Sequence, residues 1–418
     1  MICRVCSGET VEVVLDLGEQ PHCNTLIPPE HAAEAEPVYP LRLCYCHDCT
    51  TAQIDYTVPK ETMFSWYPYV SGTTRTLRDH FDDSAARLVE RLGLGGDDLV
   101  VDIGSNDGTW LKAFARHGVR GIGVEPAENV VELARADGVE TLHRFFEEAT
   151  AREILHGHGA PSLVTAAGVF FHLEELHSAT EGAAILCEAG ARFCIQAIYL
   201  GEMLSKNHFD NIYHEHLTYW SLTSISSLLE LHGLEVFDVS LLPIHGGTME
   251  YLVGRKGANP VQPSVAQLRK DETAAGFDRV ETYRAFAERV WEIRDRLLDI
   301  LTQYRDAGKT VYAFGAPAKG ATMLNSFGID TGFLDCATER NPLKFDQLMP
   351  GSRLPIVDEE KADPPDAYLI LPWNFLGEFL LRNRDYIMGG GAFIVPLPEP
   401  HVITGENFSA YCPEHEQP

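Results

Sequence analysis

The sequence VVDIGSNDGTWL at residues 100–111 indicates the fold of the segment around it. An apolar, strand-like run leads into a turn that contains Gly104 and Gly108, and a helix-like pattern begins at Thr109. Glycines in such a turn let the backbone approach a ligand closely, and the N-terminus of the following helix offers unpaired N–H groups. The pattern therefore predicts the strand, turn and helix of a ligand-binding α/β domain.

The next strand-like run, about twenty residues on, ends at Glu125, where an acidic side chain commonly binds both hydroxyls of an adenosine ribose. NAD and S-adenosylmethionine both fit this much, as does a glycine turn without a cofactor. Asp102 and Asp107 favour S-adenosylmethionine, because carboxylates suit its cationic sulfonium and amino group but repel a diphosphate. The spacing G-x-x-x-G also differs from the dinucleotide pattern. The expected cofactor contacts are Asp102, Gly104, Asn106, Asp107, Gly108, Glu125, Pro126 and Asn129.

Strand-like and helix-like runs alternate on either side of this turn, which predicts a parallel, doubly wound sheet. A helix is expected around residues 74–92, and one long amphipathic helix over residues 264–307 after a Gly/Pro-rich linker at 257–263. A second strand–turn–helix unit begins near residue 310. The strand-like runs are LVVDIG, GIGVEP, SLVTAAG, RFCIQAI and MEYLVG, and later AYLILPW and AFIVPLP.

The composition limits the class of protein. The 418 residues are too many for one core, and 45% hydrophobic with 22% charged residues is ordinary for a globular protein. A formal charge of -28 disfavours nucleic acids and anionic lipid as partners, and no apolar run is long enough for a membrane span. No secretory signal precedes the first cysteines. We expect a cytoplasmic monomer that acts on a small molecule.

Six of the ten cysteines lie within the first 49 residues, and four of them form two C-x-x-C pairs. Each pair can direct two thiolates at one cation, so Cys3, Cys6, Cys46 and Cys49 predict a tetrahedral structural zinc site. Cys44 offers a third thiol beside the second pair. Disulfides and a redox motif are the alternatives, but the expected compartment and the two-pair spacing argue against them.

Titratable side chains gather in the run HFDNIYHEH at residues 208–216, just after a predicted strand. Ligands of doubly wound domains bind beyond the carboxyl ends of the strands, so this loop is expected at the cofactor site. Acid–base chemistry explains the group best, with metal binding by the H-x-H pair or surface histidines as the alternatives. The further candidates are His172, His245, Tyr67 and Tyr69.

With these motifs the chain resembles the sugar C-methyltransferases, which modify nucleotide-linked deoxy-keto-sugars in bacterial natural-product pathways. The resemblance spans nearly the whole chain. It implies a zinc-binding module at about residues 1–70, a Rossmann-like S-adenosylmethionine-binding domain at 71–257 and a Rossmann-like C-terminal domain at 258–418. The motifs are both C-x-x-C pairs, SGTT after Tyr69, DIGSNDGT, GVEPAENV, IYHEHLTYWSL, PIHGGTMEY, FGAPAKGATMLN and NPLKFDQLMPGSRLPI.

The resemblance implies roles for the candidate residues. His216 would be the general base that removes a proton from the carbon next to a ketone, Glu215 would orient it, and His172 would share the pocket. Tyr67, Tyr69, Tyr213 or a histidine such as His245 would stabilise the enolate oxygen, and these donors are not ranked.

The chain also departs from the family pattern. Gln196 and Glu250 stand where acidic and cationic residues are usual, NPLKFDQ lacks one lysine, and QPHCN at residues 20–24 has His22 and Cys23 in place of apolar residues. A methyltransferase acting on oxygen, nitrogen or a non-sugar carbonyl compound, and a non-catalytic scaffold, are therefore alternatives. Lys319 in the GAPAKG turn is expected either to help bind an anion or to lie in a structural turn.

Overall fold

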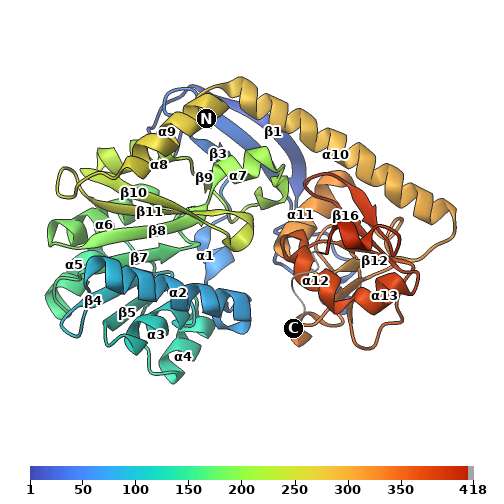
Figure 1. Ribbon diagram of the computed structural model, residues 1–418, viewed down its shortest axis with the longest axis horizontal. Coiled ribbons are helices and arrows are strands. Elements are labelled where there is room, and N and C mark those ends of the chain that lie inside the picture. The colour runs from blue at the N-terminus through green and yellow to red at the C-terminus, as the bar shows by residue number, and fades with distance from the viewer. Residues whose placement is uncertain (413–418) are drawn as a thin grey trace.

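The computed structural model describes residues 1–412, which form three β-sheets with helices packed around two of them (Figure 1). The first sheet has the strand order β1-β2-β3-β9 and is antiparallel. Its fourth strand comes from far along the chain and pairs with β3 next to the cysteine pairs. The bounds are β1 Val11–Gln20, β2 Tyr39–Cys46, β3 Ala52–Ile54 and β9 Thr218–Tyr219.

The second sheet has the order β10-β11-β8-β7-β4-β5-β6, in which β4 to β8 are parallel and β10 and β11 are antiparallel. Its strands are β4 Leu99–Ile103, β5 Arg120–Glu125, β6 Thr141–His143, β7 Leu163–Ala167, β8 Arg192–Ile198, β10 Leu234–Leu242 and β11 Thr248–Arg255. The helices between and before them are α1 Lys60–Phe64, α2 Arg75–Leu92, α3 Thr109–Arg116, α4 Glu128–Ala136, α5 Glu148–Gly157, α6 Leu176–Glu188, α7 Leu200–Ser205 and α8 Leu222–Leu231.

Both faces of this sheet are covered, which explains why β4 reads as a continuous apolar run. Successive residues of a strand point to opposite faces. Val100 accordingly joins an apolar cluster with Phe81 of α2 and Trp110 of α3, whereas Val101 joins a cluster with Ile154 of α5. A parallel strand covered on two sides cannot alternate apolar with polar residues.

The run at residues 264–307 is two helices and not the single helix that the sequence predicts. These are α9 Pro263–Ala275 and α10 Val280–Asp306. Gly276 ends α9 with φ of 77° in the left-handed region, a conformation that terminates helices and favours glycine. The long α10 then runs across the molecule from the second sheet to the third (Figure 1).

The third sheet has the order β14-β13-β12-β15-β16-β17 and is parallel except for β17. It consists of β12 Val311–Phe314, β13 Ala337–Glu339, β14 Ile356–Asp358, β15 Ala367–Ile370, β16 Ala392–Val395 and β17 His401–Ile403, with α11 Ala318–Phe327, α12 Leu376–Arg382 and α13 Arg384–Met388. The predicted α/β class, with a Rossmann-like arrangement in two sheets and a small cysteine-rich module, is confirmed.

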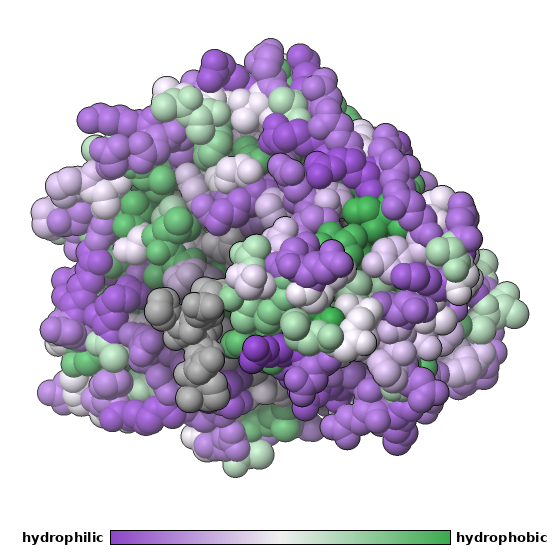
Figure 2. All heavy atoms as spheres, turned by 45° about the vertical axis from the view of Figure 1, so that its right-hand side comes forward, coloured by the Kyte–Doolittle hydropathy of each residue, from purple (hydrophilic) through white to green (hydrophobic). Residues whose placement is uncertain are grey.

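The surface is largely hydrophilic on the face drawn in Figure 2, where apolar residues occur in small separate groups. Among residues 1–412, no helix combines the length and the apolar character needed to cross a bilayer.

Candidate active site and zinc-binding module

The predicted glycine turn joins β4 to α3 in a conformation that requires glycine. Gly104 and Gly108 have φ of 65° and 73°, in the left-handed region. A Cβ atom on Gly104 would lie 2.3 Å from Cγ2 of Val169, closer than real contacts allow. The turn is thus both strained for other residues and tightly packed.

Two buried carboxylates lie at the carboxyl ends of the adjacent strands β4 and β5. Glu125 accepts hydrogen bonds from the backbone N–H groups of Asn106 and Ala127, at 2.9 Å each, through different oxygens. Each oxygen retains a lone pair for a ligand hydroxyl. Asp102 accepts a 2.7 Å bond from Thr165, and burial raises the pKa of Asp102 to about 7.

These residues fit S-adenosylmethionine. Oγ of Ser105 is buried against Gly123 of β5 and has no hydrogen-bond partner within residues 1–412. The carboxylates suit hydroxyl and cationic groups. Pro126 directly follows Glu125, and its carbonyl accepts from the ring of His143 at 3.0 Å.

A segment that the sequence did not connect to the cofactor, residues 65–73, lies over this turn. The side chain of Asn106 accepts from Ser71 N at 2.9 Å and donates to Tyr69 O at 3.0 Å. Gly72 N donates to Asp107 at 3.1 Å. Asn129 pairs with both backbone groups of Tyr67, at 3.0 and 2.8 Å. Three predicted cofactor contacts, Asn106, Asp107 and Asn129, are therefore hydrogen-bonded to residues 65–73, which cover the turn.

The ring of His216 is fixed by a backbone carbonyl. Its Nδ1 lies 2.8 Å from the carbonyl oxygen of Asn211, an acceptor, so Nδ1 carries the hydrogen and Nε2 presents its lone pair. Burial lowers the pKa of His216 well below its usual value, which keeps the ring neutral. The expectation that Glu215 orients this ring is wrong, because the Asn211 carbonyl occupies Nδ1.

Aromatic rings pack around the buried ring of His216. Tyr213 and His172 lie with ring centroids 3.9 Å and 5.1 Å from it, and His172 stacks on Phe64 at 5.3 Å. Burial lowers the pKa of His172 to about 4. His172 and His216 thus lie side by side, although they are 44 positions apart in the chain.

Glu215 is almost completely buried and points away from His216, towards the first sheet. Its Oε2 accepts from the Tyr67 hydroxyl at 2.9 Å, and Oε1 accepts from Asn24 Nδ2 at 2.5 Å. Burial raises the pKa of Glu215, but the neighbouring rings of His22 and His172 outweigh that effect and lower it overall. Tyr67 therefore links the covering segment to the catalytic loop.

Two of the candidates lie outside this group of rings. Tyr69 is 42% exposed and 6.5 Å from the Tyr67 ring, above the glycine turn. His245 has φ of 55° in the loop before β11, where the neighbouring Gly246 approaches His208 and Trp373.

The C-terminal sheet contacts the catalytic loop directly. Trp373 donates to Asp210 at 2.7 Å and lies 4.3 Å from the His208 ring, centroid to centroid. Lys319 of the GAPAKG turn lies over Trp373 at 5.7 Å, and its buried Nζ has no hydrogen-bond partner in the described part of the chain. The sequence did not indicate this contact, because no spacing pattern reports it.

Gln196 and Glu250, two of the departures from the family pattern, are cross-strand partners on β8 and β11. Gln196 donates to Glu250 at 3.0 Å, and Arg87 of α2 donates to both oxygens of Glu250, at 2.5 and 2.8 Å. The unusual carboxylate is thus neutralised inside the protein by a bidentate pair.

The four cysteines of the two C-x-x-C pairs converge, with their sulfur atoms all within 4.8 Å of one another. Cys3 and Cys49 are 3.6 Å apart, as are Cys6 and Cys46, measured between sulfurs. The backbone N–H groups of Val5 and Gly8 donate to the sulfurs, as they do around structural zinc. Cys44 points elsewhere, towards the Arg42 carbonyl.

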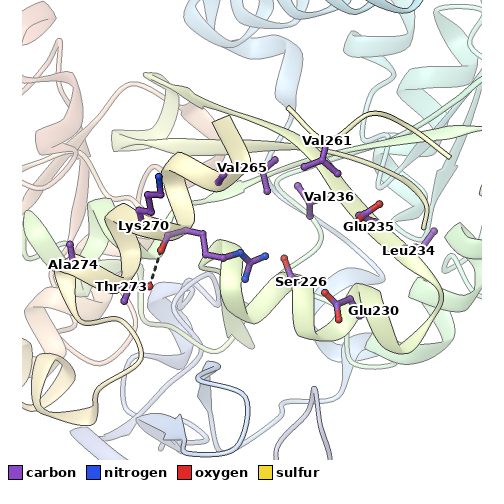
Figure 3. Close-up of a pocket in the computed structure, with 12 residues that line it drawn as sticks. Ser226, Glu230, Leu234, Glu235, Val236, Val261, Val265, Lys270, Thr273 and Ala274 are labelled. Atoms are coloured by element: carbon purple, nitrogen blue, oxygen red, sulfur yellow. Dashed lines mark hydrogen bonds between the residues drawn. The ribbon is translucent and has the colours of Figure 1, made fainter. Parts of the chain in front are cut away.

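One surface pocket lies away from all of these residues. It is a cavity of 740 Å³ on the outer side of α8, α9 and β10, where Val236, Val261 and Val265 form an apolar wall (Figure 3). None of the candidate site residues lines it.

Comparison with known proteins agrees with this organisation. Residues 3–64 match the family described as "Putative zinc binding domain", residues 77–239 a methyltransferase domain, and residues 243–398 the C-methyltransferase C-terminal domain. C-methyltransferase NovU of Streptomyces niveus is 35% identical over 408 residues, which cover 97% of each chain.

Solved structures also resemble parts of the chain. Magnesium protoporphyrin IX methyltransferase of Synechocystis, solved with bound SAM, is 16% identical over 42% of this chain and 79% of its own, with a TM-score of 0.31. A Pyrococcus horikoshii protein is 15% identical over 46% and 96%, with a TM-score of 0.36.

The sheet, the glycine turn and the family matches define an S-adenosylmethionine-dependent methyltransferase with a zinc-binding module. At 35% identity over nearly its full length to NovU, the chain belongs to the C-methyltransferase family.

Proposed function

We propose that this enzyme methylates the carbon next to the ketone of a nucleotide-linked deoxy-keto-sugar, with His216 as the general base. The observation that carries the proposal is the orientation of the His216 ring, whose Nδ1 is bonded to Asn211 O so that Nε2 is an open proton acceptor. Within residues 1–412 no hydrogen bond occupies that atom. The ring packs against the rings of Phe171, His172 and Tyr213, in the loops that follow β7 and β8.

The residues around the base have defined tasks in this proposal. His216 Nε2 removes the proton from the carbon, and the Asn211 carbonyl stabilises the imidazolium that forms. The hydroxyl of Tyr213 donates to the enolate oxygen, because Tyr67 already donates its only hydroxyl hydrogen to Glu215. Bound S-adenosylmethionine supplies the electrophilic methyl group. The predicted contacts Asp102, Glu125 and the glycine turn bind it, and residues 65–73 exclude water from the site.

Two observations support the proposed substrate class: the family to which the chain belongs, and one cationic side chain, Lys319. The nearly full-length similarity supports a substrate like that of the sugar C-methyltransferases and a place in deoxysugar and natural-product biosynthesis. Lys319 supports an anionic substrate, because its buried ammonium group faces the catalytic loop without a hydrogen-bond partner among the described residues. Three domains, divided at about residues 70 and 257, are part of this proposal.

Proton exchange tests the proposal. Incubation with S-adenosylhomocysteine and a nucleotide-linked 4-keto-deoxysugar in D₂O is expected to place deuterium on the carbon next to the ketone, detected by NMR. His216→Gln should slow exchange and methylation by at least ~10²-fold. His31→Gln is the matched control, because His31 is exposed and bonded only to Glu34. A methyl group found on oxygen, or unchanged exchange in His216→Gln, would overturn the proposal.

A further inference from the structure

Three side chains of types that bind metals lie close together next to the catalytic loop, and they are separate from the four-cysteine site. They are His22 and Cys23, from the loop after β1, and Glu215 of the catalytic loop, and their donor atoms all lie within 4.8 Å of one another. Cys23 is 5% exposed and Glu215 is 1% exposed. We propose that His22, Cys23 and Glu215 form a second metal site, for a divalent cation of the zinc class.

The orientation of His22 matches that of a metal ligand. Its Nδ1 lies 3.1 Å from the Thr25 hydroxyl, which can accept the ring N–H and so leave the Nε2 lone pair directed at the cluster. An imidazole held through its other nitrogen is the usual arrangement at metal centres. Nε2 is buried and, in the described chain, makes no hydrogen bond, although Glu215 Oε1 is 3.2 Å away.

The carboxylate of Glu215, like the ring of His22, is held in place by hydrogen bonds with neighbouring side chains. Tyr67 donates to Oε2 of Glu215 and Asn24 donates to Oε1, so the side chain has little freedom to turn away. Oε1 still has a lone pair on the side of His22. Neighbours that fix a ligand in this way commonly govern metal affinity.

The donor set suits zinc. One imidazole nitrogen, one thiolate and one carboxylate oxygen are three of the ligand types that Zn²⁺ accepts, and a site with three protein ligands leaves a fourth position open. Bonds of about 2.0–2.3 Å require donors roughly 3.3–3.8 Å apart, so the side chains need only small movements. Binding converts the Cys23 thiol to a metal thiolate and releases its proton to solvent.

A metal bound to Glu215 would place a Lewis acid on the same carboxylate that Tyr67 of the proposed site contacts. That consequence rests on the proposed function, whereas metal binding itself does not. The two sequence departures at positions 22 and 23 then have a common purpose, because the apolar residues of the family pattern could not bind a metal.

Zinc analysis of the purified full-length protein tests the site without measuring activity. After equilibration with micromolar Zn²⁺ and gel filtration, the protein is expected to hold two equivalents. Cys23→Ser should hold one, and so should the double variant His22→Leu/Cys23→Ala, which restores the apolar family pattern and is expected to fold. Cys187→Ser, which removes a buried thiol of α6 away from both clusters, should keep two.

Cobalt substitution gives a second readout. The difference spectrum between Co²⁺-loaded wild type and Cys23→Ser should contain a thiolate-to-cobalt charge-transfer band from one cysteine. A wild-type protein that holds one equivalent of zinc, or a Cys23→Ser variant that retains two, overturns the proposal. Either result leaves the proton-exchange test of the proposed function unaffected.

Discussion

Among single residues, two glycines with nearly the same backbone conformation allow the stability cost of backbone strain to be distinguished from the cost of close packing. Gly104 and Gly93 have φ of 65° and 66°, but a Cβ atom on Gly93 meets nothing within 4 Å, whereas one on Gly104 meets Val169 at 2.3 Å. Gly93→Ala should therefore cost about 1 kcal/mol, from the left-handed conformation alone.

Gly104→Ala should cost roughly 2–4 kcal/mol, because overpacking adds to that strain. It should also weaken cofactor binding, because the turn must shift. Chemical denaturation of both variants, with titration of S-adenosylhomocysteine, measures the two effects. Equal losses of stability and unchanged affinity would contradict the role of the close contact with Val169.

The raised pKa of Asp102 leads to a prediction about how the stability of the folded state depends on pH. Burial is the main reason that its pKa rises to about 7, against the opposing effect of the Thr165 hydrogen bond. The carboxyl group titrates near 3.9 in the unfolded chain, so the folded state keeps the proton to higher pH. This group's contribution to stability is therefore greatest below about pH 4 and falls as the pH rises to about 7.

Asp102→Asn removes that dependence. In cofactor-free protein, the variant should gain stability relative to wild type between pH 5 and pH 7, by about 1.4 kcal/mol per pH unit at most. Urea denaturation at several pH values measures the difference. Parallel curves for the two proteins would show that Asp102 is already ionised at pH 5.

At the scale of elements, the ion pair of Arg87 ties α2 to the strands β8 and β11. Glu250 is 1% exposed, and removal of its partner would leave a buried charge without compensation. Arg87→Met should cost about 3 kcal/mol, and Glu250→Gln in the same chain should recover part of it. Arg75→Met is the control, since its pair with Asp79 is exposed and contributes little.

Denaturant unfolding of the single and double variants measures this coupling. A loss in Arg87→Met no larger than in Arg75→Met would mean that the buried carboxylate is stabilised by other groups, such as Gln196.

The sequence predicted the central parallel strands β4, β7, β8, β15 and β16 because their apolar runs are bounded by turn residues. It missed the three-residue parallel strands β6, β13 and β14, which have no such run, and it did not predict that β11 is antiparallel. It predicted one helix over 264–307 because the amphipathic pattern continues across Gly276, and only the left-handed conformation there ends α9. The strand β9 has only two residues, and its pairing with β3 depends on contacts that are distant in sequence.

The candidate site was predictable to the extent that its residues follow strands. His172 and His216 come after β7 and β8, so the topology alone brings them together. Partners from other parts of the chain were not predictable, among them Asn24 on Glu215 and residues 65–73 on the glycine turn. Even the adjacency of Glu215 and His216 misled, because neighbouring side chains in this loop point to different sides.

At the scale of the whole molecule, the zinc-binding module and the catalytic loop share a sheet. Strand β9 begins two residues after His216, and Ile54 N of the module donates to Leu217 O at 3.1 Å. In the same sheet, Cys46 is the last residue of β2, and Cys49 lies between β2 and β3. Hydrogen bonds therefore connect the folded zinc-binding module directly to Leu217, the residue next to the proposed base His216.

This arrangement predicts that loss of the four-cysteine zinc reduces catalysis at a distance. Metal binding by such sites contributes on the order of 10 kcal/mol to folding, so Cys46→Ser should destabilise the first sheet far more than Cys187→Ser. Hydrogen exchange should rise over residues 211–219, and kcat should fall together with the zinc content. If Cys46→Ser lost its zinc but kept wild-type protection in that segment and full activity, the module would be independent of the site. The proposal that β9 couples zinc binding to the order of the catalytic loop would then be wrong, independently of the role of His216.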